Sequence, residues 1–320
     1  MPDEFEVIHH PQISTLNLFL ITVKYRTPHL HRDFELDFIL DGEARIQSQG
    51  RDYAVKPGQL CIFNPNCPHE LLRHKGNATI LCLQIPQDFF KDYFPGSEGI
   101  QFDFTMPDDM NRSLVQKKLL PEAIDLAIHY FTRAEHYKLH CAGLLHLLLY
   151  HLVSSTPFHP ITADELLTSK RRAKRLNRIL EYADQNYMYK IRLSDLAKQE
   201  KLSLGYLSHF VKDNINQTFQ EYIDGLRYNQ ARKLLSTGEK SILDVCIESG
   251  FSDPRYLSRA FLHREKMTPD EFRRKNLGNE PPPTDEAGPS DQTYYNDEDS
   301  LHRFQHYRKI LCGETGENSL

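Results

Sequence analysis

The stretch that decides the fold of the C-terminal half is residues 193–212, which read LSDLAKQEKLSLGYLSHFVK. Apolar residues recur there at helical spacing in two short runs, and the polar pair Glu200 and Lys201 separates the runs. Ser203 stands where the N-cap of the second run is expected. Two short helices joined by a tight turn form a helix-turn-helix, so the stretch predicts one such unit.

The same pattern recurs about fifty residues later in the chain. Residues 241–262 read SILDVCIESGFSDPRYLSRAFL, where Leu257 and Ser258 correspond to Leu207 and Ser208 of the first unit. An internal repeat of this kind predicts two copies of one functional unit.

A long helix is expected to connect the two copies. The sequence from Thr218 to Glu221 is a capping box at its start, and the sequence from Thr268 to Glu271 is a second box, with Pro269 at the first helical position of a final helix. A continuous helix between the copies would fix their separation.

The net charge of −5 conceals an uneven distribution. Residues 170–275 hold 22 Lys or Arg and 14 Asp or Glu, a net charge of +8. Residues 1–169 hold 14 and 21, and residues 276–320 hold 3 and 9, so the rest of the chain carries −13. Basic charge confined to one segment is typical of a nucleic-acid-binding module joined to a domain that does not bind nucleic acid.

With these features, residues 176–276 resemble the AraC/XylS family of bacterial transcription regulators. The positions in register with the family pattern are Leu196, Ala197, Ser203, Leu207, Tyr222, Arg227, Ala231, Leu234, Leu235, Ile242, Val245, Gly250, Phe251, Tyr256, Leu257, Arg259, Phe261, Thr268, Pro269, Phe272 and Arg273. The resemblance implies that one recognition helix of each unit enters one of two successive major grooves of double-stranded DNA. It also implies an activator that contacts RNA polymerase. The sequence departs from the family pattern at Asn216, Cys246, Glu265 and Lys266, so we expect a looser end to the second recognition helix.

The base-reading residues are expected on the outward faces of the two recognition helices, because packing fixes the inward ones. Arg255 and Arg259 are four residues apart and can each present a planar fork to guanine, although a solvated face with structural ion pairs is the alternative for both. The predicted DNA-binding residues are Leu204, Gly205, Ser208, His209, Lys212, Pro254, Arg255, Ser258, Arg259 and His263.

The first hundred residues read as short β segments bounded by Gly, Pro, Asn or Asp-Gly. Evenly spaced short strands are typical of a sandwich or barrel. Hairpin turns are expected at Asp41–Gly42 and at Gln49–Gly50, and another tight turn at 56–58. The expected strands are 17–25, 34–40, 44–49, 58–64, 69–74 and 78–85.

A helical pattern follows over residues 106–160. Two helices fit it best, with Pro121 in a first turn and the second helix at roughly 139–153. The second helix carries leucines on more than one side, so it must bury more than one side. We expect it to serve as a dimerisation element, with a purely intramolecular core as the alternative.

A group of histidines marks the expected barrel. His29, His31 and Glu35, followed by Pro65 and His69, resemble the two motifs of the cupin barrel. A strand's period of two points the first two histidines to one face, where His69 arrives from a neighbouring strand. Three imidazoles and one carboxylate could hold Fe, Mn, Ni or Zn.

Three interpretations of this histidine group stay open at this stage: a metal site, polar contacts to a small effector, and structural hydrogen bonding. The family resemblance implies a small-molecule effector, often a sugar, and no required cofactor. The predicted effector-binding residues are His29, His31, Glu35, His69 and Arg26, and the first four are also the candidate metal ligands.

The sequence therefore predicts an α+β multidomain protein with a cupin-like barrel and an all-α double helix-turn-helix. The expected divisions are 1–105 sensory barrel, 106–160 dimerisation element, 161–175 linker, 176–276 DNA-binding domain and 277–320 acidic, largely disordered tail. The predicted function is an effector-responsive regulator of carbohydrate or other small-molecule catabolism genes, and not an enzyme. We also expect it to form a homodimer. The alternative is a cupin-type metalloenzyme, such as a dioxygenase or isomerase, with an accessory helical region.

The remaining composition bears on location. The six cysteines show no paired spacing, so we expect them to be reduced. No apolar run approaches the roughly 20 residues that span a bilayer, and the N-terminus lacks the pattern of a signal peptide. A cytoplasmic protein without a membrane partner is the expectation.

Overall fold

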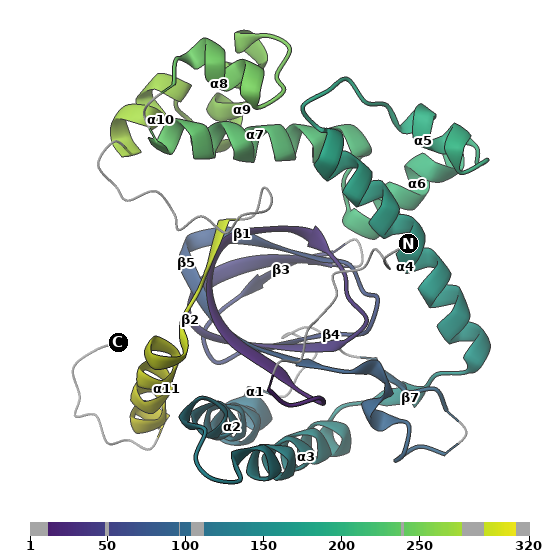
Figure 1. Ribbon diagram of the computed structural model, residues 1–320, viewed down its shortest axis with the longest axis vertical. Coiled ribbons are helices and arrows are strands. Elements are labelled where there is room, and N and C mark those ends of the chain that lie inside the picture. The colour runs from purple at the N-terminus through teal and green to yellow at the C-terminus, as the bar shows by residue number, and fades with distance from the viewer. Residues whose placement is uncertain are drawn as a thin grey trace.

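The computed structural model places a β-barrel at the centre of the molecule, with two layers of helices on opposite sides of it (Figure 1). The helices that follow the barrel in sequence lie on one side, and the helix-turn-helix units lie on the other. The structure describes residues 12–48, 51–95, 97–103, 112–237, 240–276 and 291–311. Within these ranges no helix is both long and apolar enough to cross a membrane.

The barrel is built from antiparallel strands. Its main path runs β3-β2-β5-β1-β8, and β4 pairs with β2. The strands are β1 (Asn17–His29), β2 (Phe34–Ser48), β3 (Arg51–Val55), β4 (Leu60–Phe63), β5 (His69–Ile85) and β8 (Asp291–Tyr294). A separate two-stranded sheet pairs β6 (Ile100–Phe102) with β7 (Phe158–Pro160). The predicted fold class is confirmed.

The barrel wall is apolar on both faces, because alternate residues of each strand face different cores. In β2, Phe34, Leu36 and Phe38 belong to the core shared with the helices, whereas Ile39 belongs to the core inside the barrel. This double burial explains why the strands read as dense apolar runs. The inner face of the same strand carries Glu35, which is 1% exposed.

The expected hairpin at Asp41–Gly42 is wrong. The segments 34–40 and 44–49 form one long strand through residue 48, and Gly42 is a point of irregular register opposite β5. Gly42 has a φ of +72°, and a Cβ there would lie 2.0 Å from the carbonyl oxygen of Asn77. Long-range pairing with β5 thus outweighs the local turn signal. The predicted turn at 49–50 lies outside the described residues, and the turn before β4 is present at Pro57 and Gly58.

The helices after the barrel pack on its outer face. The longest is α3, whose buried leucines Leu145, Leu148, Leu149 and Leu152 belong to the core that the helices share with the barrel, while Leu147 is 45% exposed. The elements are η1 (Gln87–Phe90), α1 (Arg112–Leu114), a π-helical turn (Val115–Leu119), α2 (Leu120–Thr132) and α3 (Tyr137–Ser155).

The expected linker 161–175 is largely helical instead. Helix α4 (Ala163–Asn186) begins there with a capping box between Thr162 and Glu165 and continues into the core of the first helix-turn-helix. The strong N-cap and the absence of Gly or Pro along the helix account for its length. Figure 1 shows α4 running beside the barrel from β7 to the helix-turn-helix units.

The two helix-turn-helix units have the predicted local structure. Ser203 caps α6, and the boxes from Thr218 to Glu221 and from Thr268 to Glu271 are formed. Asn216 and Lys266 end α6 and α9 alike in the left-handed conformation, so the expected looser second ending is not seen. The elements are α5 (Leu193–Gln199), α6 (Leu204–Ile215), α7 (Phe219–Thr237), α8 (Ile242–Glu248), α9 (Pro254–Glu265) and α10 (Pro269–Asn276).

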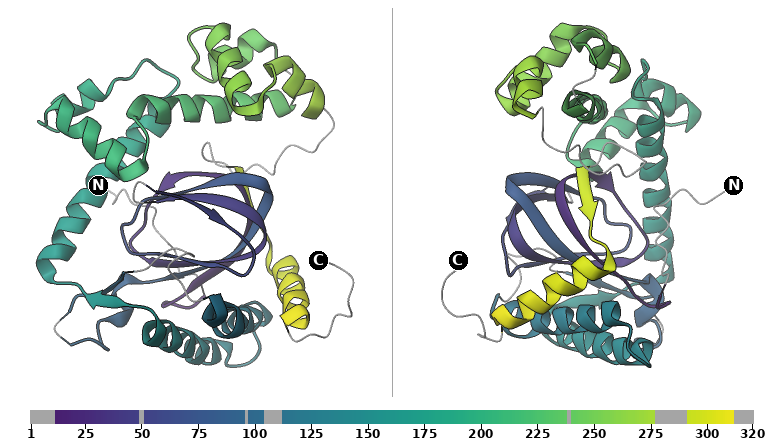
Figure 2. Two further views of the ribbon diagram at one scale, coloured as in Figure 1. Left: turned by 180° about the vertical axis from the view of Figure 1, so that it is seen from behind. Right: turned by 60° about the vertical axis from the view of Figure 1, so that its left-hand side comes forward.

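The expected disordered tail is ordered over residues 291–311. Strand β8 adds to the free edge of β1, and α11 (Asp297–Leu311) packs on α2 (Figure 2). Phe304 is fully buried there and stacks on Phe131. The chain thus returns from the helix-turn-helix units to the barrel. Residues 277–290 and 312–320 of the predicted tail lie outside the described residues.

Candidate functional site

The predicted base readers of α9 share one open surface. Pro254, Arg255, Ser258, Arg259 and His263 line a single shallow concavity, together with Leu262, which the sequence prediction missed. Ser258 is partly buried and the other four are exposed. The inward residues of the same helix are the buried Leu257 and Phe261, as a helix packed on one side requires.

The first recognition helix presents its predicted readers in the same way. Leu204, Gly205, Ser208, His209 and Lys212 are all exposed on α6. Nδ1 of His209 donates to the carbonyl of Gly205 at 2.7 Å, which leaves its Nε2 for an outside partner. Tyr206 is 48% exposed and was not predicted; its hydroxyl accepts a hydrogen bond from Arg175 of α4 at 2.9 Å.

Arg255 has a partner on its own helix. Asp253 caps α9 through the backbone N–H of Arg255, and the guanidinium donates to both carboxylate oxygens at 2.9 and 2.8 Å. These bonds lower the pKa of Asp253 to about 2. DNA would have to compete with Asp253 for this arginine, whereas Arg259 lies over the ring of Tyr256 with its polar groups exposed.

Helix α7 sets the spacing of the two units. Its 19 residues span about 28 Å at 1.5 Å per residue, close to the 34 Å between successive major grooves. Figure 1 shows α8 and α9 at one end of α7, and α5 and α6 at the other. Arg227 of α7 donates to the carbonyls of Tyr187 and Tyr189, and Gly250 approaches the backbone of Met188 so closely that a Cβ would lie 2.6 Å from its Cα.

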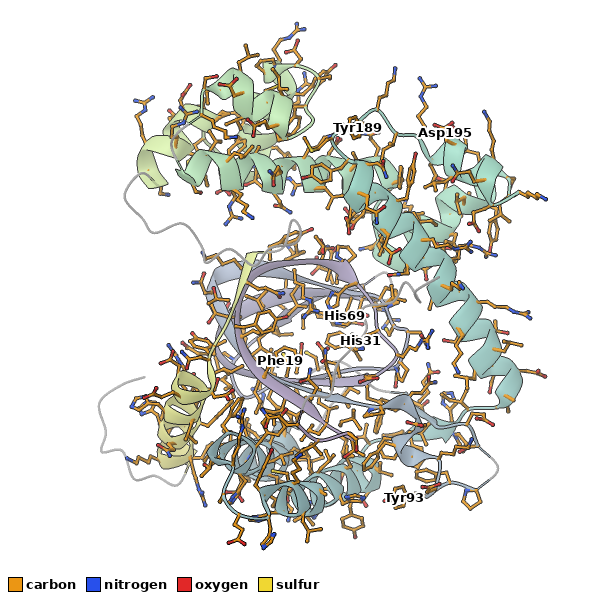
Figure 3. All side chains as sticks on the ribbon, in the orientation of Figure 1. Phe19, His31, His69, Tyr93, Tyr189 and Asp195 are labelled. Carbon is orange, nitrogen blue, oxygen red and sulfur yellow. The ribbon has the colours of Figure 1, made fainter. Side chains whose placement is uncertain are left out.

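The histidine group lies together inside the barrel, as the sequence predicts. Nε2 of His31 is 2.8 Å from Oε2 of Glu35, and Nε2 of His69 is 3.6 Å from Oε1 of the same carboxylate. The ring of His29 lies 4.1 Å from that of His69. Figure 3 shows His31 and His69 next to each other within the barrel, with Phe19 farther across it.

Burial controls the protonation of this group. Burial and the charge of Arg26 hold the pKa of His29 well below its ordinary value, and burial lowers the pKa of His69. For Glu35, burial acts to raise the pKa, but the charge and hydrogen bonds of His31 and His69 outweigh it and hold the pKa well below the usual range. The centre therefore contains a carboxylate, and burial favours the neutral ring of His29 and of His69.

Two further polar side chains of the centre were missed by the sequence prediction. Gln84 donates to Oε2 of Glu35 at 2.7 Å and is itself held by Asn17 at 2.8 Å. Asp37 is 1% exposed, and burial together with the charge of Glu35 raises its pKa well above the usual range. Asp37 stands two residues after Glu35, so strand periodicity could have placed it on the inner face.

The centre adjoins the first helix-turn-helix. Leu30, between the two histidines of the motif, is 1% exposed and packs in the core formed by α4, α5, α6 and α7. On the same side, His69 and Glu70 of the barrel and the end of α6 at Asn214 and Asn216 line one small pocket. Strand residues near the ligand candidates thus also contact the DNA-binding domain.

A second hollow lies between the domains. Its volume is about 640 Å³, in the range of small-molecule sites, and it is bordered by the loop before β5, by α4 and by the end of α6. Asn66 lines it in a left-handed conformation and is 9% exposed, and its side-chain amide has no hydrogen-bond partner among the described residues. The polar lining includes Asn64, Asp164, Glu165, Thr168, Ser169, Arg172, Asp213 and Asn214.

Comparison with known families and proteins agrees with this architecture. Residues 19–153 match the AraC-like ligand binding domain, and residues 196–275 match a helix-turn-helix domain family. The chain belongs to the AraC family of DNA-binding transcription regulators. Within that family it pairs an AraC-like ligand binding domain with the AraC-type helix-turn-helix domain.

Its relatives are named as regulators. A helix-turn-helix-type transcriptional regulator of Staphylococcus aureus is 21% identical over 82% of this chain, and the chain spans about a third (34%) of that protein's length. The regulator YbfI of Bacillus subtilis is 24% identical, and the match covers 72% of this chain and 80% of YbfI. The melibiose operon regulatory protein of Escherichia coli is 20% identical, covering 79% and 87%.

Solved structures with some likeness include ToxT of Vibrio cholerae bound to an unsaturated fatty acid. It is 15% identical over 83% of this chain and 97% of its own, with a TM-score of 0.36. The C-terminal domain of AraT from Geobacillus stearothermophilus is 24% identical over 35% of this chain and 92% of its own, with a TM-score of 0.31.

Proposed function

We propose that this regulator responds to a small-molecule effector and activates genes for the catabolism of a carbohydrate or another small molecule. In this proposal α6 and α9 read DNA, α3 mediates homodimerisation in the cytoplasm, and RNA polymerase is the partner of the DNA-bound form. The protein acts by binding and not as an enzyme. The name of the melibiose operon regulatory protein among its relatives supports a sugar as the effector.

The contact between the two domains is the observation that best supports a response to an effector. Leu30 leaves the barrel and packs in the core of the first helix-turn-helix, and a cleft of about 640 Å³ is lined from both sides. A ligand that binds one relative arrangement of the domains better than another shifts the population toward it. The side-chain amide of Asn66, which has no partner among the described residues, and the carboxylates beside it suit the hydroxyl groups of a sugar.

The proposed dimer surface is the outer side of α3. Leu147 is 45% exposed and Tyr150 is 64% exposed there, on a helix whose other side is buried in the core shared with α2. A second copy of the same helix would cover both side chains in an isologous contact. The test measures the molecular mass in solution of the parent chain and of Leu147→Glu. We expect a dimer for the parent and a monomer for the variant.

The experiment for DNA reading selects binding sequences from random DNA with the purified full chain and then measures affinity for the selected site. Arg259→Ala should weaken specific binding by roughly 1–3 kcal/mol, about 5- to 150-fold, and relax the preference at one base pair. Arg51→Ala, on the exposed barrel strand β3, is the matched control and should leave affinity and preference unchanged. Selection of no common sequence by the parent chain would refute the function.

The effector arm of the same experiment adds candidate sugars to the chain on its selected DNA. A sugar that changes DNA affinity or site spacing in the parent, and fails to do so in Asn66→Ala, supports the cleft. The prediction that His29, His31, Glu35, His69 and Arg26 contact the effector directly remains a prediction, tested by the same titration. Turnover of any added compound would favour the enzyme alternative.

A further inference from the structure

Three buried side chains of the barrel and the partly buried His29 bring their ligand atoms close together. One ligand atom from each of His29, His31, Glu35 and His69 lies within 4.8 Å of all the others. Three of these residues are at most 2% exposed, and the Nε2 atom of His29 is buried without a hydrogen-bond partner among the described residues. Buried polar atoms are normally paired, so this arrangement calls for a further occupant.

The orientation of the three rings is fixed from behind. Nδ1 of His29, His31 and His69 lies 2.9, 3.0 and 3.1 Å from the backbone carbonyls of Thr27, Asp33 and Cys67, respectively. A carbonyl only accepts, so each Nδ1 carries the proton in a neutral ring and each Nε2 presents a lone pair to the centre. Backbone-held imidazoles of this kind are the usual support of histidine metal ligands.

The carboxylate is supported in the same manner. Gln84 donates to Oε2 of Glu35, the oxygen that also lies 2.8 Å from Nε2 of His31. A nitrogen lone pair and a carboxylate oxygen at that distance need a proton or a cation between them. Three nitrogen donors and one oxygen donor match the preferences of divalent manganese, iron, cobalt, nickel and zinc, and not those of calcium or magnesium.

We propose that this four-residue centre binds a divalent transition-metal ion and that the turn between β1 and β2 transmits its occupancy to the first helix-turn-helix. The proposal rests on the proposed function and adds a second input to it, separate from the sugar in the interdomain cleft. Where bound, the ion supplies charge neutralisation and a fixed attachment point for strands β1, β2 and β5.

The transmission follows from the alternation of side chains along the turn. His29 and His31 point to the centre, and Leu30 between them is buried in the core of the DNA-binding domain. An ion that holds both histidines therefore also holds Leu30 against α4 and α6. His69 reaches the end of the same recognition helix, since it lines a pocket with Asn214, Ile215 and Asn216.

The test begins with ion binding to the full chain, stripped with a chelator and titrated separately with Co²⁺, Mn²⁺ and Zn²⁺. We expect one ion per chain by elemental analysis, with imidazole nitrogen couplings in the electron paramagnetic resonance spectrum of the Mn²⁺ form. Glu35→Gln and His69→Gln should weaken ion binding at least about tenfold, because loss of a residue that only supports a metal ligand already costs about that much. His159→Gln, an exposed histidine paired with Asp103, is the matched control.

The second step measures hydrogen exchange with and without the ion. The ion should slow exchange in the turn 29–33 and in α6, and Leu30→Ala should remove the effect on α6 while one ion per chain still binds. Circular dichroism of each stripped variant checks folding, and His29→Asn, which keeps a donor for the Thr27 carbonyl, replaces any ligand variant that fails it.

Each outcome decides the proposal. Absence of stoichiometric binding by all three ions, or equal binding by the ligand variants and the control, overturns the metal centre. Ion binding that leaves exchange in α6 unchanged overturns the transmission. Neither result touches the proposed function, whose own test is sequence selection on DNA, so failure of one is distinguishable from failure of the other.

Discussion

Phe304 is the anchor of the C-terminal segment, and its removal should release that segment from the sensory domain. The side chain is fully buried, and its ring stacks on Phe131 at 5.8 Å between centroids. The ion pairs of α11 with Arg133 and Asp125 are largely exposed and contribute little. We therefore expect Phe304→Ala to remove most of the free energy that holds α11 on α2.

The magnitude follows from burial. Truncation of a core phenylalanine to alanine costs roughly 3–5 kcal/mol. A change of about 3 kcal/mol lowers the ratio of docked to undocked tail roughly a hundredfold. What remains is the four-residue pairing of β8 and the bonds of Tyr295, whose hydroxyl lies 2.8 Å from that of Thr22 and whose N–H donates to Leu20 at 3.0 Å.

Hydrogen exchange read by mass spectrometry measures the effect segment by segment. In Phe304→Ala, amides of 291–311 and of the β1 edge should exchange up to about a hundredfold faster, while α6 and α9 keep their parent rates. Phe304→Leu keeps most of the apolar volume and should lie near the parent. Unchanged exchange in 291–311 would refute the anchoring argument, and equal acceleration throughout α2 and α3 would refute the separate release of the tail.

Three further changes have expected outcomes. Gly250→Ala forces a Cβ to 2.6 Å from a backbone atom at a φ of +80°, so chemical denaturation should show a loss of more than about 2 kcal/mol, whereas Gly143→Ala, in open helical space, should show none. Burial raises the pKa of Glu70 from 4.5 to about 7, so protonation of its carboxyl group favours the folded state. The free energy of unfolding of the parent should therefore fall by up to about 3 kcal/mol as the pH rises from about 4.5 to about 7. In Glu70→Gln, unfolding curves measured across this pH range should lack that part of the pH dependence. Residues 170–276 alone, freed from a remainder carrying −13, should bind nonspecific DNA more tightly in gel-shift titrations at low salt, and equal affinity would contradict the electrostatic argument.

The helix-turn-helix units were predictable because their signals are local. Ser203 and the two capping boxes each act within a few residues, and the structure forms all three as expected. Asp41–Gly42 shows the opposite case. A local turn signal there was outweighed by pairing with β5, which is distant in sequence and becomes visible only when the sheet is assembled.

The ordered tail could not be predicted from its composition. Residues 277–300 are acidic and Pro-rich, which favours disorder in an isolated segment. The ordering of 291–311 depends on a free edge of β1 and on an apolar site beside Phe131, and neither is encoded in the tail itself. A single buried aromatic such as Phe304 is too weak a sequence signal to outweigh the composition around it.

The members of the buried histidine group were predictable from the sequence, and its surroundings only partly so. Once His29 and His31 face inward, strand alternation requires Leu30 to face outward, away from the barrel interior. A leucine that is 1% exposed on the outer side must be covered by another part of the protein. The sequence can therefore predict that a second body rests on this turn, but the identity of that body depends on the path of α4 along the barrel. Because that body is the first helix-turn-helix, the proposed ion at the two histidines should act on the unit that we propose reads DNA.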